Sequence, residues 1–304
     1  FGIFFYCSTI PFIPLMPGLW ALVILFFLLG VSSGMSDVAM NAQAVMVEKQ
    51  MQKPIMTSFH ALFSIGMALG AFAGAFFTKV AVGMSLHFTI VSAISLIAIF
   101  IARYYLVHDK PQTKTTEEPA FRLPNAAMVS IGGIAFCSML GEGAMADWST
   151  NYMENIAKAD HALAPIGLSA FALAMTIGRI FGDGARVKFG DRSLMIVCGL
   201  IATLGLSIAI ISSQPFIVIA GLFIVGIGLS TIVPIAYSIA GHTKDLPPGV
   251  GLAMVTTVGY SGFLFGPPII GFIAQWENLR VALGFVALLF LVMTFLSFQR
   301  KDKT

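Results

Sequence analysis

The sequence contains few charged residues. Of its 304 residues, 10% are Asp, Glu, Lys or Arg and 58% are hydrophobic, whereas a soluble domain carries about 25% charged residues. So few charges cannot cover a surface that faces water, and lipid is therefore the expected solvent for most of the chain. The net charge of +3 is small, and no Lys/Arg cluster is dense enough to suggest binding to nucleic acid, so we expect no nucleic acid as a partner.

The sequence also lacks the motifs of metal sites and of membrane enzymes. Its three cysteines lie in apolar runs without CxxC or Cys/His spacing, which predicts buried thiols rather than a metal site or disulfides. There is no HExxH motif and no intramembrane His/Asp/Ser constellation. We therefore expect neither an enzyme nor a cofactor.

Long apolar runs are abundant instead. A membrane-spanning helix needs about 20 apolar residues, and ten segments approach or exceed that length, the first of them partial. The fold class is therefore an all-α polytopic membrane protein. The predicted spans are 1–15, 19–47, 55–78, 85–106, 125–148, 163–184, 193–212, 215–241, 248–274 and 279–299.

One polar stretch divides the chain. Residues 108–124 hold three prolines, several threonines and charges of both signs, a composition typical of a linker. When this linker is placed in the cytoplasm, fourteen of the 17 Lys and Arg residues fall on its side of the membrane. The linker and the C-terminus are therefore expected to be cytoplasmic.

A weak internal repeat indicates two related halves. Gly30 and Gly226 lie 196 residues apart, and the same offset relates Gly66 to Gly262. The second half begins near residue 125, so the same offset would place the start of the first half about 70 residues before Phe1. That length is enough for two spans and part of a third. We therefore expect an N-terminally truncated chain, with helices 3–6 of a first bundle in 1–107 and helices 7–12 of a second bundle in 125–304.

Twelve helices in two related halves resemble the major facilitator superfamily. Within it, "GMSDVAMNAQAVMVE" (34–48) and "SFHALFSIGMALGA" (58–71) resemble the fucose-permease-like branch. The segments "GEGAMADW" (141–148) and "GYSGFLFGPPIIG" (259–271) resemble its bacterial inner-membrane members. The resemblance implies two six-helix bundles, a location in the cell inner membrane, and solute transport.

The superfamily also has a short signature between the second and third helices of each half. Here it reads "GRIFGDGARVKFGDR" (178–192), and the resemblance implies a loop that gates the cytoplasmic face. Asp183 and Val187 depart from the pattern, so a charge relay in this half stays open. The positions that fit the signature are Gly178, Arg179, Gly190 and Arg192.

Asp37, Glu142 and Asp147 are the carboxylates well inside the spans. Ionisable groups at membrane depth are costly and commonly serve ions or protons. We predict proton coupling at Asp37, where the resemblance also implies an acidic coupling residue, and at Glu142, which lies between two glycines. A helix–helix hydrogen bond is the alternative for Asp37. Asn41, one turn further, could bind a solute hydroxyl or join helices.

Four further side chains are candidates for binding the solute. His60 resembles a sugar-contacting position of the family, Trp148 could stack on a sugar ring, and Tyr237 and Tyr260 lie on second-half helices that mirror those of Asp37 and His60. The alternatives are an interfacial or loop-capping role for the histidine, membrane anchoring for the tryptophan and core packing for the two tyrosines.

The sequence therefore predicts a monomeric secondary transporter that moves a small polar, sugar-like solute by alternating access, coupled to protons and embedded in the lipid bilayer. We expect no Lys or Arg in the central cavity, which argues against an anionic substrate. Proton-driven efflux of drugs or metabolites is one alternative. A membrane sensor that binds its ligand without moving it is another.

Overall fold

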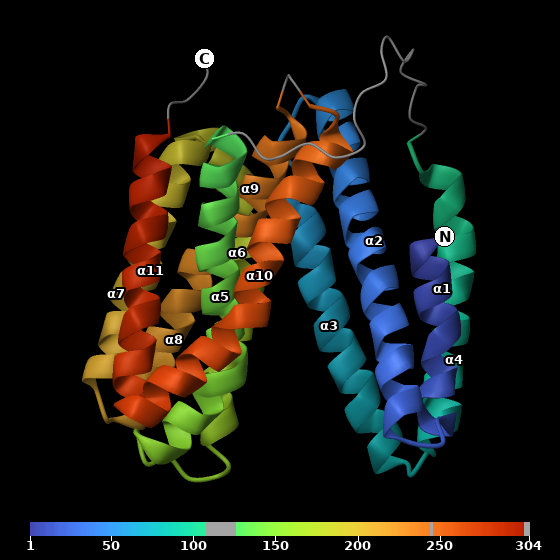
Figure 1. Ribbon diagram of the computed structural model, residues 1–304, viewed down its shortest axis with the longest axis horizontal. Coiled ribbons are helices and arrows are strands. Elements are labelled where there is room, and N and C mark those ends of the chain that lie inside the picture. Colours follow the sequence, from blue (N-terminus) through green and yellow to red (C-terminus); the bar gives the residue numbers. More distant parts are fainter. Residues whose placement is uncertain (108–125, 244–245, 301–304) are drawn as a thin grey trace. The chain divides into compact units, whose positions relative to one another are not determined.

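The structure, a computed structural model, describes residues 1–107, 126–243 and 246–300 (Figure 1). In these ranges nine helical segments are long and apolar enough to cross a membrane, and Gly2–Leu15 is a shorter apolar helix. Lipid offers no partners to backbone N–H and C=O groups, so helices that pair these groups internally suit such a sequence. The predicted all-α fold is confirmed, and the predicted linker, 108–124, lies outside the described residues.

The described residues form two compact units. Unit 1 comprises residues 1–50 and 65–107, and unit 2 comprises residues 51–64 together with everything described from 126 onward. The units thus depart at one place from the halves 1–107 and 125–304, because residues 51–64 pack with the second half. The cause is a set of polar contacts at the start of one helix, described below.

Unit 1 is built from the first helices of the chain. Its helix α4 packs against α1 and the 3-10 helix η1, and Ser92 Oγ donates a buried hydrogen bond of 2.6 Å to Cys7 O. Gln43 pairs with the backbone N–H and C=O of Val107, at 3.0 and 2.9 Å. The elements are α1 (Gly2–Thr9), η1 (Ile10–Leu15), α2 (Leu19–Met51), α3 (Met56–Lys79), α4 (Met84–Ala102) and η2 (Arg103–Tyr105), and the first turns of α3 belong to unit 2.

Unit 2 is arranged around α5, which packs against α6 and α8 to α11. Its elements are α5 (Ala126–Asn155), α6 (Ala164–Phe189), α7 (Asp191–Ile211), α8 (Pro215–Leu229), α9 (Ile232–Gly241), α10 (Pro248–Trp276) and α11 (Leu279–Gln299). Glycines let helices α7 and α8 approach closely. A Cβ on Gly205 would lie 2.7 Å from Val225 N, and one on Gly221 would lie 2.7 Å from Gly205 O.

Candidate functional site

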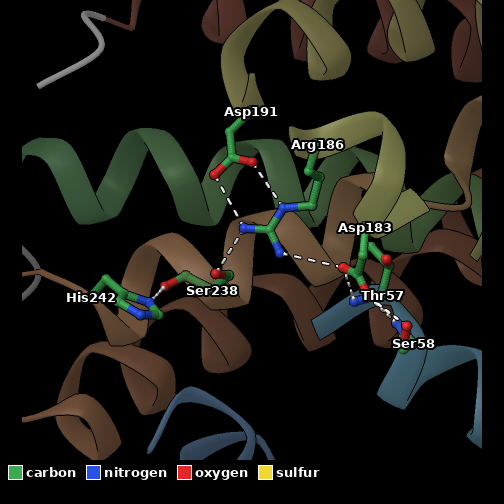
Figure 2. Close-up of polar contacts among 7 residues, drawn as sticks. All are labelled: Thr57, Ser58, Asp183, Arg186, Asp191, Ser238 and His242. Carbon is green, nitrogen blue, oxygen red and sulfur yellow. Dashed lines mark hydrogen bonds and ion pairs between the residues drawn. The ribbon is translucent and has the colours of Figure 1, made fainter. Parts of the chain in front are cut away.

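The start of α3 is held by a carboxylate of α6. The first N–H groups of a helix have no partner within the helix. Here Asp183 accepts hydrogen bonds from Thr57 N at 3.0 Å, from Ser58 N at 2.8 Å and from Ser58 Oγ at 2.6 Å (Figure 2). A negative charge at this end also stabilises the helix dipole. A residue that is distant in sequence therefore caps α3 and draws residues 51–64 into unit 2.

Arg186 supports this capping carboxylate. Its guanidinium donates to both carboxylate oxygens of Asp191, at 2.8 and 3.2 Å, and to Ser238 Oγ at 2.9 Å. A third nitrogen lies 3.8 Å from Asp183 Oδ1 (Figure 2). Gly190, with φ of 77°, makes the turn that brings Asp191 to the first position of α7. We call Asp183, Arg186, Asp191 and the first turn of α3 the latch.

Arg179 lies inside helix α6, one to two turns deeper than the latch, and its residue is only 7% exposed. It donates to Ser64 Oγ at 2.6 Å and to Ser230 O at 3.4 Å, and it lies 3.5 Å from Glu142 Oε1. Gly178 and Arg179 lie in a helix, as the predicted span 163–184 has them, and not in the loop that the signature implies, because α6 continues to Phe189. Unit 2 therefore does contain a buried arginine within a candidate span.

His60 and Tyr237 extend this group. Ser64 Oγ donates to His60 O at 3.1 Å, one turn earlier on the same face of α3. The rings of His60 and Tyr237 lie 5.9 Å apart, edge to face, and Tyr237 is 1% exposed. The His60 Nε2 atom is buried and has no hydrogen-bond partner among the described residues. We call Glu142, Arg179, Ser64, His60 and Tyr237 the Arg179 cluster.

The remaining predicted proton-coupling and solute-binding residues are Asp37 and Asn41 of unit 1 and Trp148 and Tyr260 of unit 2. Asp37 and Asn41 belong to unit 1, where Asn41 Nδ2 donates to Asp37 Oδ1 at 3.1 Å and to its carbonyl at 2.9 Å. Trp148 is half-buried, and its Nε1 atom has no partner within the described chain. Tyr260 is 41% exposed, with its ring 6.1 Å from that of Phe263.

Two of the signature residues have packing contacts. Arg192 donates to Phe298 O at 2.6 Å, and its guanidinium lies 5.4 Å from the centre of the Phe298 ring. Gly178 lies directly against Ser230, so that a side chain at position 178 would collide with the serine hydroxyl. These contacts hold α7 to α11 and α6 to the end of α8.

Sequence reasoning missed Ser64, Asp183, Arg186 and Asp191 as members of the site. In the sequence, Asp183 stands out only as a departure from the loop signature. Its partners Thr57 and Ser58 lie 126 and 125 residues earlier in the chain, and no local pattern relates such distant positions. An acidic residue near the end of one helix and a serine-threonine pair at the start of another are the only signals that the sequence offers.

Comparison with known proteins identifies the fold. A family model described as Major Facilitator Superfamily matches residues 1–130 and 131–304. The chain belongs to the Major Facilitator Superfamily. The predicted resemblance to this superfamily is thereby confirmed, and this MFS protein is a multi-pass membrane transporter rather than an enzyme.

Its relatives include bacterial transporters. An uncharacterized MFS-type transporter of Yersinia pestis is 35% identical over 289 residues, covering 94% of this chain and 74% of that protein. An uncharacterized transporter of Sinorhizobium fredii is 31% identical over 282 residues, covering 92% and 74%. The crystal structure of the MFS transporter FucP in the outward conformation has a TM-score of 0.79 and 15% identity, covering 99% of this chain and 82% of FucP. That similarity shows a shared fold.

Proposed function

We propose that this MFS protein is a proton-coupled secondary transporter that moves a small polar, sugar-like solute by alternating access. The observation that carries the proposal is the Arg179–Glu142 pair. An arginine and a carboxylate inside candidate membrane spans are costly to keep there, and such pairs mark ion and solute pathways. A second solved structure with this fold, at 15% identity and a TM-score of 0.77, is the E. coli fucose:proton symporter FucP.

Glu142 is the first candidate for carrying the proton. Its side chain is 28% exposed while that of Arg179 is 8% exposed, and a carboxylate can accept a proton whereas a guanidinium is already protonated. Asp37 of unit 1 is the second candidate. A proton bound at either carboxylate favours the conformations in which that carboxylate is neutral, and in this way it shifts the populations of the transport states.

The latch supports the gating role expected of residues 178–192. With the linker and C-terminus in the cytoplasm of a bacterial inner-membrane protein, the latch lies on the cytoplasmic side. Formation of the Asp183 hydrogen bonds to Thr57 and Ser58 then closes the cytoplasmic end. Their rupture frees the start of α3 and allows the inward-open state. Gly190 permits the turn that the latch needs.

The test is transport by the full-length protein in proteoliposomes. Wild type is expected to accumulate a neutral or acidic sugar when the lumen is alkaline, and to exchange it without a pH gradient. Glu142→Gln should lose accumulation and keep exchange. Asp147→Asn changes an exposed carboxylate of the same helix and should keep both.

Three results would count against the proposal. Binding without exchange would indicate a sensor, and accumulation that depends on an opposite gradient would indicate efflux. Full accumulation by the Glu142→Gln variant would remove Glu142 from the coupling.

A further inference from the structure

The two buried arginines of α6 differ in how well a carboxylate satisfies them. Arg186 makes two hydrogen bonds to Asp191, at 2.8 and 3.2 Å. Arg179 makes one contact with a carboxylate, Glu142, at 3.5 Å. Charge-assisted hydrogen bonds of this kind are ordinarily about 2.7–2.9 Å long and often bidentate. Of the two arginines, Arg179 is therefore the one that can still form closer hydrogen bonds to a carboxylate.

The remaining contacts of Arg179 are with neutral groups. Ser64 Oγ accepts at 2.6 Å and Ser230 O accepts at 3.4 Å. A guanidinium keeps its charge inside a protein, and its planar fork matches the two oxygens of a carboxylate. A buried cation that is held at 3.5 Å from its counter-ion gains from any carboxylate that approaches more closely.

A second unsatisfied group lies in the same cluster. The His60 Nε2 atom is buried without a hydrogen-bond partner among the described residues. Ser64 joins this histidine to Arg179, since its hydroxyl accepts from the arginine and donates to His60 O. An unpaired polar atom in such a place is costly unless a ligand completes it. A hydroxyl group is a suitable ligand, because it can donate or accept.

From these contacts, and resting on the proposed function, we infer that Arg179 binds the carboxylate of a hydroxylated organic anion, such as a sugar acid. The carboxylate of the anion replaces Glu142 as the partner of Arg179, and Glu142 accepts the co-transported proton. The cluster then exchanges an Arg⁺/Glu⁻ pair for an Arg⁺/anion⁻ pair beside a neutral Glu142. Its net charge stays at zero, so one proton moves with each monoanion and the transport is electroneutral.

Few other charged groups act on Glu142. It lies on α5, and α6 contributes Arg179. Helix α8 carries no titratable side chain, and α9 and α10 carry one described tyrosine each, Tyr237 and Tyr260. Helix α11 carries Arg280 near its start, and the guanidinium of this residue donates a hydrogen bond to Ser213 Oγ. The docked start of α3 adds His60. Among the described groups that face it, Arg179 is the charged side chain in contact with Glu142, at 3.5 Å.

The first test compares acids with their neutral partners. The full-length protein is screened by thermal shift and by counterflow with D-galactose against D-galacturonate and with D-glucose against D-gluconate. At least one acid should stabilise the protein and exchange, and its neutral partner should not. Arg179→Gln should abolish the response to the acid. Arg280→Gln removes a half-buried cation outside the Arg179 cluster and should leave that response intact.

The second test follows pH. Binding of the acid by wild type should weaken about tenfold per pH unit wherever Glu142 is ionised in the free protein, because one proton is taken up with the anion. Glu142→Gln should remove that slope and bind at pH 8 as wild type binds at low pH. This variant keeps a side chain of the same size, so it tests the inference even if Arg179→Gln does not fold.

The outcomes separate this inference from the proposed function. Proton-coupled uptake of neutral sugars alone would overturn the role of Arg179 and leave the transporter assignment in place. Exchange of none of these solutes would overturn both. Uptake of the acid that responds to a valinomycin-imposed potassium potential would contradict the electroneutral exchange, as would an unchanged pH slope in Glu142→Gln.

Discussion

Replacing Asp183 with Asn should loosen the latch. The carboxylate accepts from Thr57 N, Ser58 N and Ser58 Oγ at 3.0, 2.8 and 2.6 Å. Asparagine keeps one acceptor oxygen and loses both the second oxygen and the negative charge. The isosteric change leaves the packing of α6 undisturbed, so its effect falls on the bonds to α3 and on the ion pair with Arg186.

The size of the effect follows from these lost contacts. Loss of an N-terminal cap costs about 0.5–2 kcal/mol, and loss of a charge that stabilises a helix N-terminus costs about 0.3–1 kcal/mol, more when it is partly buried. We take about 2 kcal/mol for the two together. This corresponds to about a 30-fold increase in the population with a freed α3, since about 1.4 kcal/mol is a factor of ten.

The assay is thiol labelling of Thr57→Cys in a background without the three native cysteines. Thr57 is 0% exposed, so a maleimide can reach a cysteine there only when the start of α3 has moved. Labelling in inside-out vesicles should become about 30-fold faster with Asp183→Asn, provided that opening equilibrates rapidly.

Asp160→Asn is the matched control, because Asp160 also accepts hydrogen bonds from two backbone N–H groups, those of Ala162 and Leu163, and takes no part in the latch. Equal labelling rates in the Asp183→Asn and Asp160→Asn variants would refute the capping argument. Slower labelling in Asp183→Asn than in the parent would refute it as well.

Three other substitutions test the remaining elements. Asp37→Asn tests the second candidate for the proton: if Asp37 rather than Glu142 carries it, the variant loses proton-driven accumulation and keeps exchange, because an oxygen that can accept from Asn41 remains. Retained accumulation in proteoliposomes would remove Asp37 from coupling. Gly178→Ala should lower the melting temperature, at a cost of about 1–3 kcal/mol, because of the collision with Ser230, whereas Gly184→Ala on the same helix meets no atom within 4 Å and should not lower it. Tyr152→Phe removes a hydroxyl that donates to two carbonyls of α7, each at 3.2 Å, and should destabilise unit 2 by about 1 kcal/mol in a thermal melt.

The membrane made most of the fold predictable from the sequence. Apolar runs located the spans because lipid requires both apolar side chains and helical backbone. The ends were less certain: the span expected at 125–148 continues to Asn155, and the one expected at 163–184 continues to Phe189. Hydropathy finds the part of a helix that suits lipid, while the backbone continues as a helix beyond it.

The site was less predictable than the fold. Glu142 and His60 were found because a charged or titratable side chain is conspicuous in an apolar run. The signature at 178–192 places Arg179 in a loop, although the apolar run 163–184 includes it. That it pairs with Glu142 and Ser64, 37 and 115 residues away, depends on how α5 and α3 pack on α6, and this packing leaves no trace in local sequence.

The two arginines of α6 also relate solute binding to the latch. Arg179 and Arg186 are seven residues apart, so they lie on one face of the helix, about 10 Å along its axis. Both act on the start of α3: Arg179 through Ser64, and Arg186 through Asp183 and its bonds to Ser58. Because Ser58 and Ser64 belong to the same two turns of helix, a displacement that breaks the latch also draws Ser64 away from Arg179. A solute that strengthens or replaces the contact at Ser64 therefore changes the free energy of breaking the Asp183 hydrogen bonds. These two turns of α3 alone connect the two contacts.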